Sequence, residues 1–186
     1  MKRFAILVAM ATIAGCASPR SLGPYTPQTE SARDTVKAQK LTQQAAATKD
    51  PAKAEALLRE ALTADLYYGP AHNNLGTVYL KQSKLYEAVG EYEWAKKLMP
   101  GLPEPRMNLA LTLERAGRTD DALAGYQSAL EVYPEHLPSL EALARLQIRT
   151  GKTDDRTRHA LDEIALRGET DRWREWARLE LTKLKP

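Results

Sequence analysis

This chain has few residues of the types that act as nucleophiles or metal ligands, and the most distinctive of them is a single cysteine. Cys16 is the only cysteine among 186 residues, so it cannot form a disulfide within the chain. It follows a basic start, an apolar run over residues 4–13 and two small residues. A basic start and a short apolar run are the parts of an export signal. The run is about half of the ~20 residues that span a bilayer, and the alternative is a short anchor or an N-terminal core helix.

The other candidates for chemistry are three histidines and two acidic pairs. No two of His72, His136 and His159 have the spacing of metal ligands, and the chain has no phosphate-binding or nucleophile motif. The acidic pairs at 120–121 and 154–155 fall where helices are expected to begin, and there carboxylates satisfy unpaired N–H groups. We therefore expect a protein that is not an enzyme, with no catalytic residue, no metal site and no cofactor.

The residues around the cysteine resemble a known processing signal. Residues 13–16 read Ile-Ala-Gly-Cys and resemble the lipobox of bacterial lipoproteins. The resemblance implies that residues 1–15 are a signal peptide that is cleaved. Cys16 then becomes an N-terminus that carries acyl chains such as palmitate, and two or more chains make a stable membrane anchor. Ala17 follows, where lipoproteins kept in the inner membrane usually have Asp. The resemblance thus implies a cell-envelope protein at the outer membrane, facing the periplasm.

Residues 16–30 are expected to form a tether. They include Pro19, Pro24 and Pro27, and proline disfavours helix and removes hydrogen-bond donors. Loss of Lys2 and Arg3 with the signal peptide would lower the formal net charge from +3 to +1. Nucleic-acid binding requires a concentrated basic face, so we expect no nucleic-acid partner.

Residues 31–186 have the pattern of successive helices. Apolar and small residues recur at helical spacing, and no segment alternates with period two. A shift of 34 residues overlays residues 69–102 on residues 103–136. Six aligned positions are identical, and in the first copy they are Asn74, Leu75, Ala88, Tyr92, Ala95 and Pro100.

This pattern resembles the tetratricopeptide repeat, a helix-turn-helix unit of that length. The resemblance implies an all-α, right-handed α-solenoid with repeats near 35–68, 69–102, 103–136 and 137–170. A capping helix is expected at 171–185. Gly117 supplies the turn in the third repeat where the second has Ser83. In the fourth repeat, Arg156 stands where the pattern requires alanine, so the solenoid could end or bend there.

The resemblance also implies that the first helices of the repeats line a concave groove. The candidate groove residues are Asn73, Asn74, Thr77, Lys81, Met107, Asn108, Leu111, Glu114, Arg145 and Arg149. In the family, asparagine at the places of Asn74 and Asn108 often bonds the backbone of an extended partner. The alternative is that each asparagine only braces the fold. Relatives that clamp a C-terminal carboxylate use basic residues where this chain has none, so such a partner is not expected.

The expected function is that of a membrane-anchored scaffold. It would bind a protein or peptide partner in its groove and support assembly or recruitment of an envelope complex. The alternative is a structural protein that self-associates through the last helix, which carries Trp173 and Trp176. Those tryptophans could instead seal the end of the solenoid as a cap.

Overall fold

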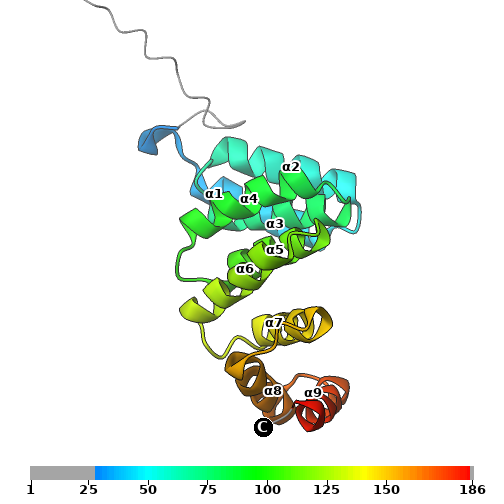
Figure 1. Cartoon of the computed structure of the whole chain (residues 1–186). Helices are drawn as coiled ribbons and strands as arrows, with labels where there is room; N and C mark the ends of the chain where they lie inside the picture. Colours follow the sequence, from blue (N-terminus) through cyan, green and yellow to red (C-terminus); the bar gives the residue numbers. More distant parts are fainter. Residues whose placement is uncertain (1–27, 185–186) are drawn as a thin grey trace, which may run out of the picture.

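The computed structural model describes residues 28–184. The expected signal peptide, Cys16 and the tether up to residue 27 lie outside this part. A short 3-10 turn, Glu30–Ala32, precedes a series of α-helices that stack in sequence order (Figure 1). The helices are α1 (Thr35–Ala47), α2 (Pro51–Ala64), α3 (Gly69–Lys81), α4 (Leu85–Leu98), α5 (Pro103–Arg115), α6 (Thr119–Val132), α7 (Leu137–Thr150), α8 (Asp155–Arg167) and α9 (Asp171–Lys183).

The helices pair into hairpins along the chain. The hairpins join α1 to α2, α3 to α4, α5 to α6 and α7 to α8, and α9 packs on α8. Each of the four ranges expected from the sequence contains one such hairpin. No strand occurs in the part of the chain that the structure describes, and the prediction of an all-α solenoid is confirmed.

The hairpin turns recur at the 34-residue period. Ser83, Gly117 and Gly151 stand 34 residues apart and all have positive φ, at 60°, 77° and 67°. Ser83 is the one residue of the three that is not glycine, and a side chain disfavours this conformation. The expected equivalence of Ser83 and Gly117 is therefore confirmed by the backbone.

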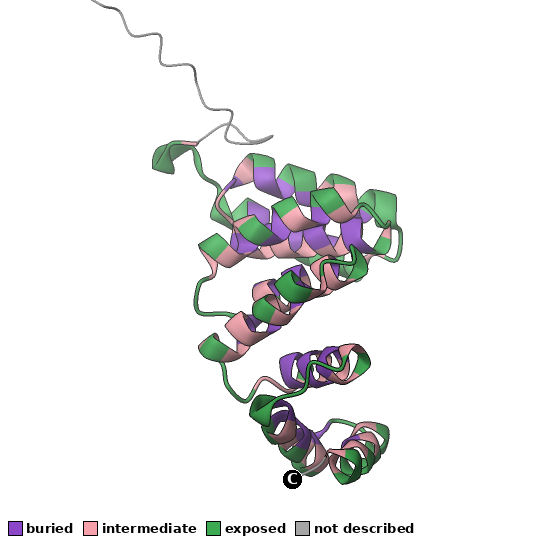
Figure 2. Ribbon diagram, in the orientation of Figure 1, coloured by how far each residue is buried: buried purple, intermediate pink, exposed green. Residues whose placement is uncertain are grey.

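The core runs along the seam between the helices of each hairpin (Figure 2). Tyr92 and Tyr126 are its largest fully buried side chains, and small residues beside them let the helices approach closely. Near the C-terminal end, the core consists of residues from α7, α8 and Ala177 of α9, with Trp173 and Trp176 packed against it. The capping role considered for these tryptophans therefore agrees with their packing.

The fourth hairpin keeps the solenoid pattern through a shift of register. The residue buried at the place of Ala88 and Ala122 is Thr157, and Arg156 beside it is exposed. The turn between α7 and α8 holds one more residue than the earlier turns, and Asp154 caps α8 by accepting from the Thr157 N–H at 3.0 Å. Arg156 therefore does not end the solenoid, because the inserted residue rotates it out of the core and α9 packs on α8 beyond it.

A buried carboxylate fixes the first described residues to the second turn. Asp65 is fully buried and accepts hydrogen bonds from Arg33 Nε at 2.8 Å and from the Thr35 hydroxyl at 2.7 Å. Burial by itself raises the pKa of Asp65, but the hydrogen bonds from Arg33 and Thr35 outweigh it and hold the pKa below its usual value. The segment before α1 is thus held against the α2–α3 turn.

The end of the expected tether also contacts this turn. The Gln28 side chain donates to the Thr63 carbonyl and accepts from the Leu66 N–H, each at 2.8 Å. Gln28, the first residue that the structure describes, is therefore already bonded to the α2–α3 region. Within residues 28–184, no helix has the length and apolar character needed to cross a membrane.

Candidate functional site

The candidate groove residues lie on α3, α5 and α7, the first helices of successive hairpins. These helices contact one another in order, α1 with α3, α3 with α5 and α5 with α7. They form one continuous layer, which we call the inner layer. Several of the candidate residues turn out to bond one another across this layer.

The joint between α3 and α5 is neutral. The Asn108 side-chain amide donates to Asn73 Oδ1 at 3.1 Å. Asn108 was expected to act with Asn74, yet its described partner is Asn73. Asn108 therefore braces two adjacent hairpins.

The hydroxyl of Tyr92 is also satisfied within the protein. It lies 3.0 Å from the Thr77 hydroxyl, which itself donates to the Asn73 carbonyl at 3.0 Å. Because the only proton of Thr77 is used in that bond, Tyr92 is the donor to Thr77. Burial raises the pKa of Tyr92, so its hydroxyl remains protonated as the bond requires.

The joint between α5 and α7 is charged. The Glu114 side chain is 7% exposed and pairs with Arg145 at 3.2 Å and with Arg149 at 2.9 Å. It also accepts a hydrogen bond from the Tyr126 hydroxyl at 2.7 Å. Burial, together with the adjacent Glu114 carboxylate, raises the pKa of Tyr126 far above its usual value. Three candidate groove residues, Glu114, Arg145 and Arg149, thus form one cluster.

An open cavity lies between the α1–α2 hairpin and α3. Its volume is about 470 Å³, and we call it the N-terminal pocket. Asn74, Thr77 and Lys81 line it from α3, and Thr48, Lys49 and Asp50 line it from the α1–α2 turn. Lys81 is exposed, and the Asn74 side chain has no hydrogen-bond partner among residues 28–184. This cavity offers amide, hydroxyl and ammonium groups above an apolar floor.

A second cavity lies at the other end of the inner layer. It has a volume of about 360 Å³ and is lined by Arg145 of α7 and by Arg172, Trp173 and Trp176 of α9. We call it the C-terminal pocket. The two indole rings meet edge to face with centroids 5.1 Å apart.

Comparison with known proteins accounts for this architecture. Residues 103–146 match the family model described as "Tetratricopeptide repeat". The solved structures similar to the chain include a tetratricopeptide repeat protein from Parabacteroides merdae, which has a TM-score of 0.66 and 24% identity. The fold is that of a tetratricopeptide-repeat (TPR) solenoid. The match covers 80% of this chain and 60% of that protein.

Other solved structures are also similar to the chain. One is the "First TPR of Spaghetti (RPAP3) bound to HSP90 peptide SRMEEVD", with a TM-score of 0.61, 16% identity, and coverage of 64% of this chain and 98% of that one. Another is MamA, with a TM-score of 0.58, 15% identity, and coverage of 79% and 81%. At these identities the likeness concerns the TPR fold alone. No curated protein matches the sequence.

The TPR layer places the predicted site residues at three points, of which the neutral joint of Asn73 and Asn108 is the first. Asn74, Thr77 and Lys81 meet at the N-terminal pocket. Glu114, Arg145 and Arg149 meet in the charged joint. Met107 and Leu111 lie on α5 between the pocket and the charged joint. Both are partly buried and pack against the core that the third hairpin shares with α7.

One polar arrangement was not foreseen from the sequence. His72 is fully buried, with Nδ1 2.7 Å from Glu91 Oε2 and Nε2 2.8 Å from the Leu66 carbonyl oxygen. Its ring stacks on Trp94 with centroids 5.3 Å apart. The pair joins α3 to α4 inside the second TPR. Among residues 28–184, no group of three or more His, Cys, Asp or Glu side chains could hold a metal ion.

Proposed function

We propose that this chain is a membrane-anchored TPR scaffold that binds a protein partner and supports the assembly or recruitment of an envelope complex. The TPR fold supports the binding role, since stacked helix pairs present an extended surface to a partner. The structures described as TPR domains include one in complex with a peptide. The lipobox resemblance at residues 13–16 supports the anchor at Cys16.

The observation that carries the binding proposal is the N-terminal pocket. Asn74 exposes an amide with both a donor and an acceptor, which suits a peptide unit. Lys81 adds an exposed positive charge, and the apolar floor can take a side chain. We therefore assign partner binding to Asn74 and Lys81. Asn108 instead bonds Asn73 and holds two adjacent hairpins together.

The test is a crosslinked pull-down from bacterial membranes. The parent protein is compared with an Asn74→Ala/Lys81→Gln double variant. The control is Lys96→Gln, because Lys96 forms an ion pair with Glu93 on the surface of α4 and lies outside the pocket. Recovery of one envelope protein with the parent and the control, and its loss with the double variant, supports the proposal. Equal recovery with all three proteins contradicts it.

The anchor is tested separately through Cys16→Ala. The parent should incorporate radiolabelled palmitate and sediment with the membrane fraction. The variant should do neither, because the thioether requires the sulfur. A variant that still sediments with outer membranes would contradict the lipid anchor, and a parent that sediments with inner membranes would contradict the outer-membrane destination.

Self-association is a second candidate, and exposed apolar residues favour it. Leu166 of α8 and Leu179 of α9 are 75% and 56% exposed near the C-terminal end. Burial of such side chains against a second copy would be favourable. Sedimentation over a range of concentrations tests this role. A dimer that is lost on Leu166→Gln/Leu179→Gln supports it, and a monomer at all concentrations contradicts it.

A further inference from the structure

The inner layer changes its construction at the C-terminal end. The first helices of successive repeats pack directly on one another from α1 to α7. Helix α9 follows α8 in the place of a further first helix, but it packs on α8 and does not pack closely on α7. The C-terminal pocket occupies the space between α7 and α9. The layer therefore ends in a lined cavity, whereas the joints between α3 and α5 and between α5 and α7 are bridged by side-chain contacts.

The lining of this pocket is rich in donors and has no carboxylate. Its residues are Arg145, Arg172, Trp173 and Trp176. Arg172 is exposed and forms no ion pair within the described chain. Arg145 uses one guanidinium nitrogen on Glu114 and is 42% exposed. An arginine has five N–H donors, so most of those on Arg145 remain available.

The two tryptophans add a different kind of surface. Both are partly exposed, and neither indole N–H has a hydrogen-bond partner among residues 28–184. The capping role uses only the side of the pair that faces the core. Here one side of the pair packs on the core and the other lines the cavity. Aromatic faces bind aromatic, proline and aliphatic groups, and indole N–H groups donate to oxygen.

We propose that the C-terminal pocket is a second docking site, which binds an acidic segment of a protein partner with a Glu or Asp side chain next to an aromatic residue. The carboxylate meets the guanidinium of Arg172, with Arg145 beside it, and the aromatic side chain packs on Trp173 and Trp176. Planar guanidinium groups match carboxylates in geometry as well as in charge. The cavity volume is near the lower end of the ~300–1,000 Å³ typical of ligand pockets, which suits one or two side chains of a peptide.

This inference rests on the proposed function only in taking the occupant to be a protein. The two pockets share no lining residue, so the site can be tested without the N-terminal pocket. If one pocket binds nothing, binding at the other pocket can still be measured. The pull-down tests the N-terminal pocket and the peptide titration tests the C-terminal pocket, so either result can be negative without the other.

The test uses the full chain with Cys16→Ser, which prevents lipidation. The probe is a capped peptide of sequence GEFEG, with capped GQFQG and GEAEG as controls for charge and for the aromatic ring. Binding is followed by NMR through the indole N–H resonances of Trp173 and Trp176. Trp94, which stacks on His72 in the second repeat, serves as the internal reference. Arg172→Gln is compared with Arg178→Gln, a matched change at an exposed arginine of the same helix.

GEFEG should shift both C-terminal indole resonances and leave that of Trp94 unchanged. GQFQG and Arg172→Gln should each weaken binding by about tenfold, the scale of one charge-assisted hydrogen bond, and GEAEG should weaken it by a similar factor because it loses the aromatic contact with the indoles. Arg178→Gln should bind like the parent. Equal binding of GQFQG, unchanged affinity in Arg172→Gln, or no shift with any peptide up to about 5 mM would each overturn the proposal. A shift of the Trp94 resonance without shifts of Trp173 and Trp176 would overturn it as well.

Discussion

The second and third repeats place the same tyrosine in the same buried position and satisfy it in different ways. Tyr92 bonds the neutral hydroxyl of Thr77 within its own repeat. Tyr126 bonds the carboxylate of Glu114, which also holds two arginines of the next repeat. The hydrogen bond of Tyr92 stays within one hairpin, whereas the contacts of Tyr126 continue through Glu114 to the neighbouring hairpin. Identical repeat positions can therefore either stabilise one repeat or couple two.

The two repeats also differ in how the helices of each hairpin approach. In the second repeat Gly76 of α3 faces the ring of Tyr92, and a Cβ built on Gly76 would lie 2.8 Å from that ring. In the third repeat Gly125 is on α6, and its Cβ would lie 2.8 Å from the Cβ of Ala110. The glycine has moved from the first helix to the second. The TPR pattern thus requires one small contact in each hairpin but does not fix which helix supplies it.

The largest expected effect comes from breaking the charged joint. Glu114→Ala would leave the buried Tyr126 hydroxyl without its acceptor and two arginines without their shared carboxylate. We expect a loss of about 3 kcal/mol in the free energy of unfolding. Thr77→Val in the second repeat should cost about 1–2 kcal/mol, since it removes the neutral hydrogen bonds to the Asn73 carbonyl and from the Tyr92 hydroxyl but breaks no ion pair. Urea unfolding followed by circular dichroism measures both changes.

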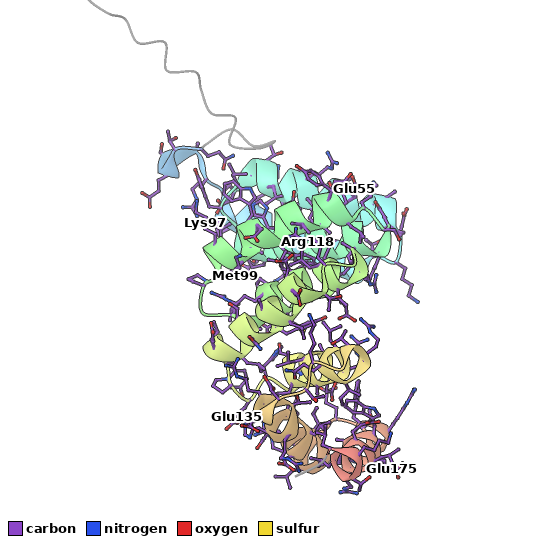
Figure 3. All side chains as sticks on the ribbon, in the orientation of Figure 1. Glu55, Lys97, Met99, Arg118, Glu135 and Glu175 are labelled. Atoms are coloured by element: carbon purple, nitrogen blue, oxygen red, sulfur yellow. The ribbon has the colours of Figure 1, made fainter. Side chains whose placement is uncertain are left out.

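The control for that comparison is Glu175→Ala. Glu175 is exposed on α9 at the far end of the molecule (Figure 3), and its loss should change stability by less than about 0.5 kcal/mol. Equal costs for Glu114→Ala and Thr77→Val would contradict the difference between the two joints.

The second prediction concerns the close helix contacts. Overpacking costs about 1–3 kcal/mol, and alanine regains about 1 kcal/mol of helix propensity over glycine. Gly125→Ala should therefore destabilise the protein by about 1 kcal/mol. Ala110→Gly removes the Cβ that it meets, so the double variant should recover the packing part of the loss. Strictly additive effects in this double-mutant cycle would show that the predicted contact does not exist.

A third prediction extends the comparison to the fourth repeat. Glu141 of α7 holds the position that Asn73 and Met107 hold in the earlier repeats, and its Oε1 is buried without a partner in the described chain. Burial, with repulsion from Glu169, raises the pKa of Glu141 to about 7. The folded state then retains a proton that the unfolded state has lost between about pH 4.5 and 7. Stability from this group is present at low pH and is lost as the pH rises through 7.

Glu141→Gln should remove this loss. We expect the variant to match the parent at pH 4.5 and to exceed it at pH 8 by about 1 kcal/mol, because solvent screens a partly exposed group. Thermal unfolding across this pH range measures the difference. Parallel pH profiles for the parent and the variant would rule out Glu141 as the titrating group.

The smallest effect is expected at the hairpin turns. Ser83 adopts positive φ where the next two repeats have glycine. Ser83→Gly relieves about 1 kcal/mol of backbone strain and loses part of that to unfolded-state entropy. A net gain of about 0.5 kcal/mol in thermal unfolding is expected, and Gly117→Ser should show the reverse. A Ser83→Gly variant that is less stable than the parent would contradict the turn assignment.

The sequence predicted the features that recur within each repeat, but it did not predict the bonds that join one repeat to the next. The 34-residue overlay located the hairpins, the turn at Gly117 and the buried tyrosines, since these follow from positions within one repeat. The bond between Asn108 and Asn73 joins residues 35 apart, and Arg145 meets Glu114 across 31 residues. These contacts depend on how one hairpin stacks on the next, and helical periodicity contains no information on that stacking.

The register of α8 and the His72–Glu91 pair were missed for related reasons. A fixed period of 34 residues cannot register one inserted residue, so Arg156 was aligned with the buried alanines although Thr157 takes their place. His72 and Glu91 lie on different helices, and only the packed hairpin brings them within 2.7 Å. Both features arise from three-dimensional packing of residues that look ordinary in sequence.

The contacts around Asp65 have a mechanical consequence. Gln28 and Arg33 are both bonded to the segment between α2 and α3. Tension applied through the chain before Gln28 would therefore reach that turn before it reached α1. The load would be shared between the first two hairpins, and α1 would not be peeled away turn by turn. A domain held in this way resists pulling at its N-terminal end through two hairpins at once.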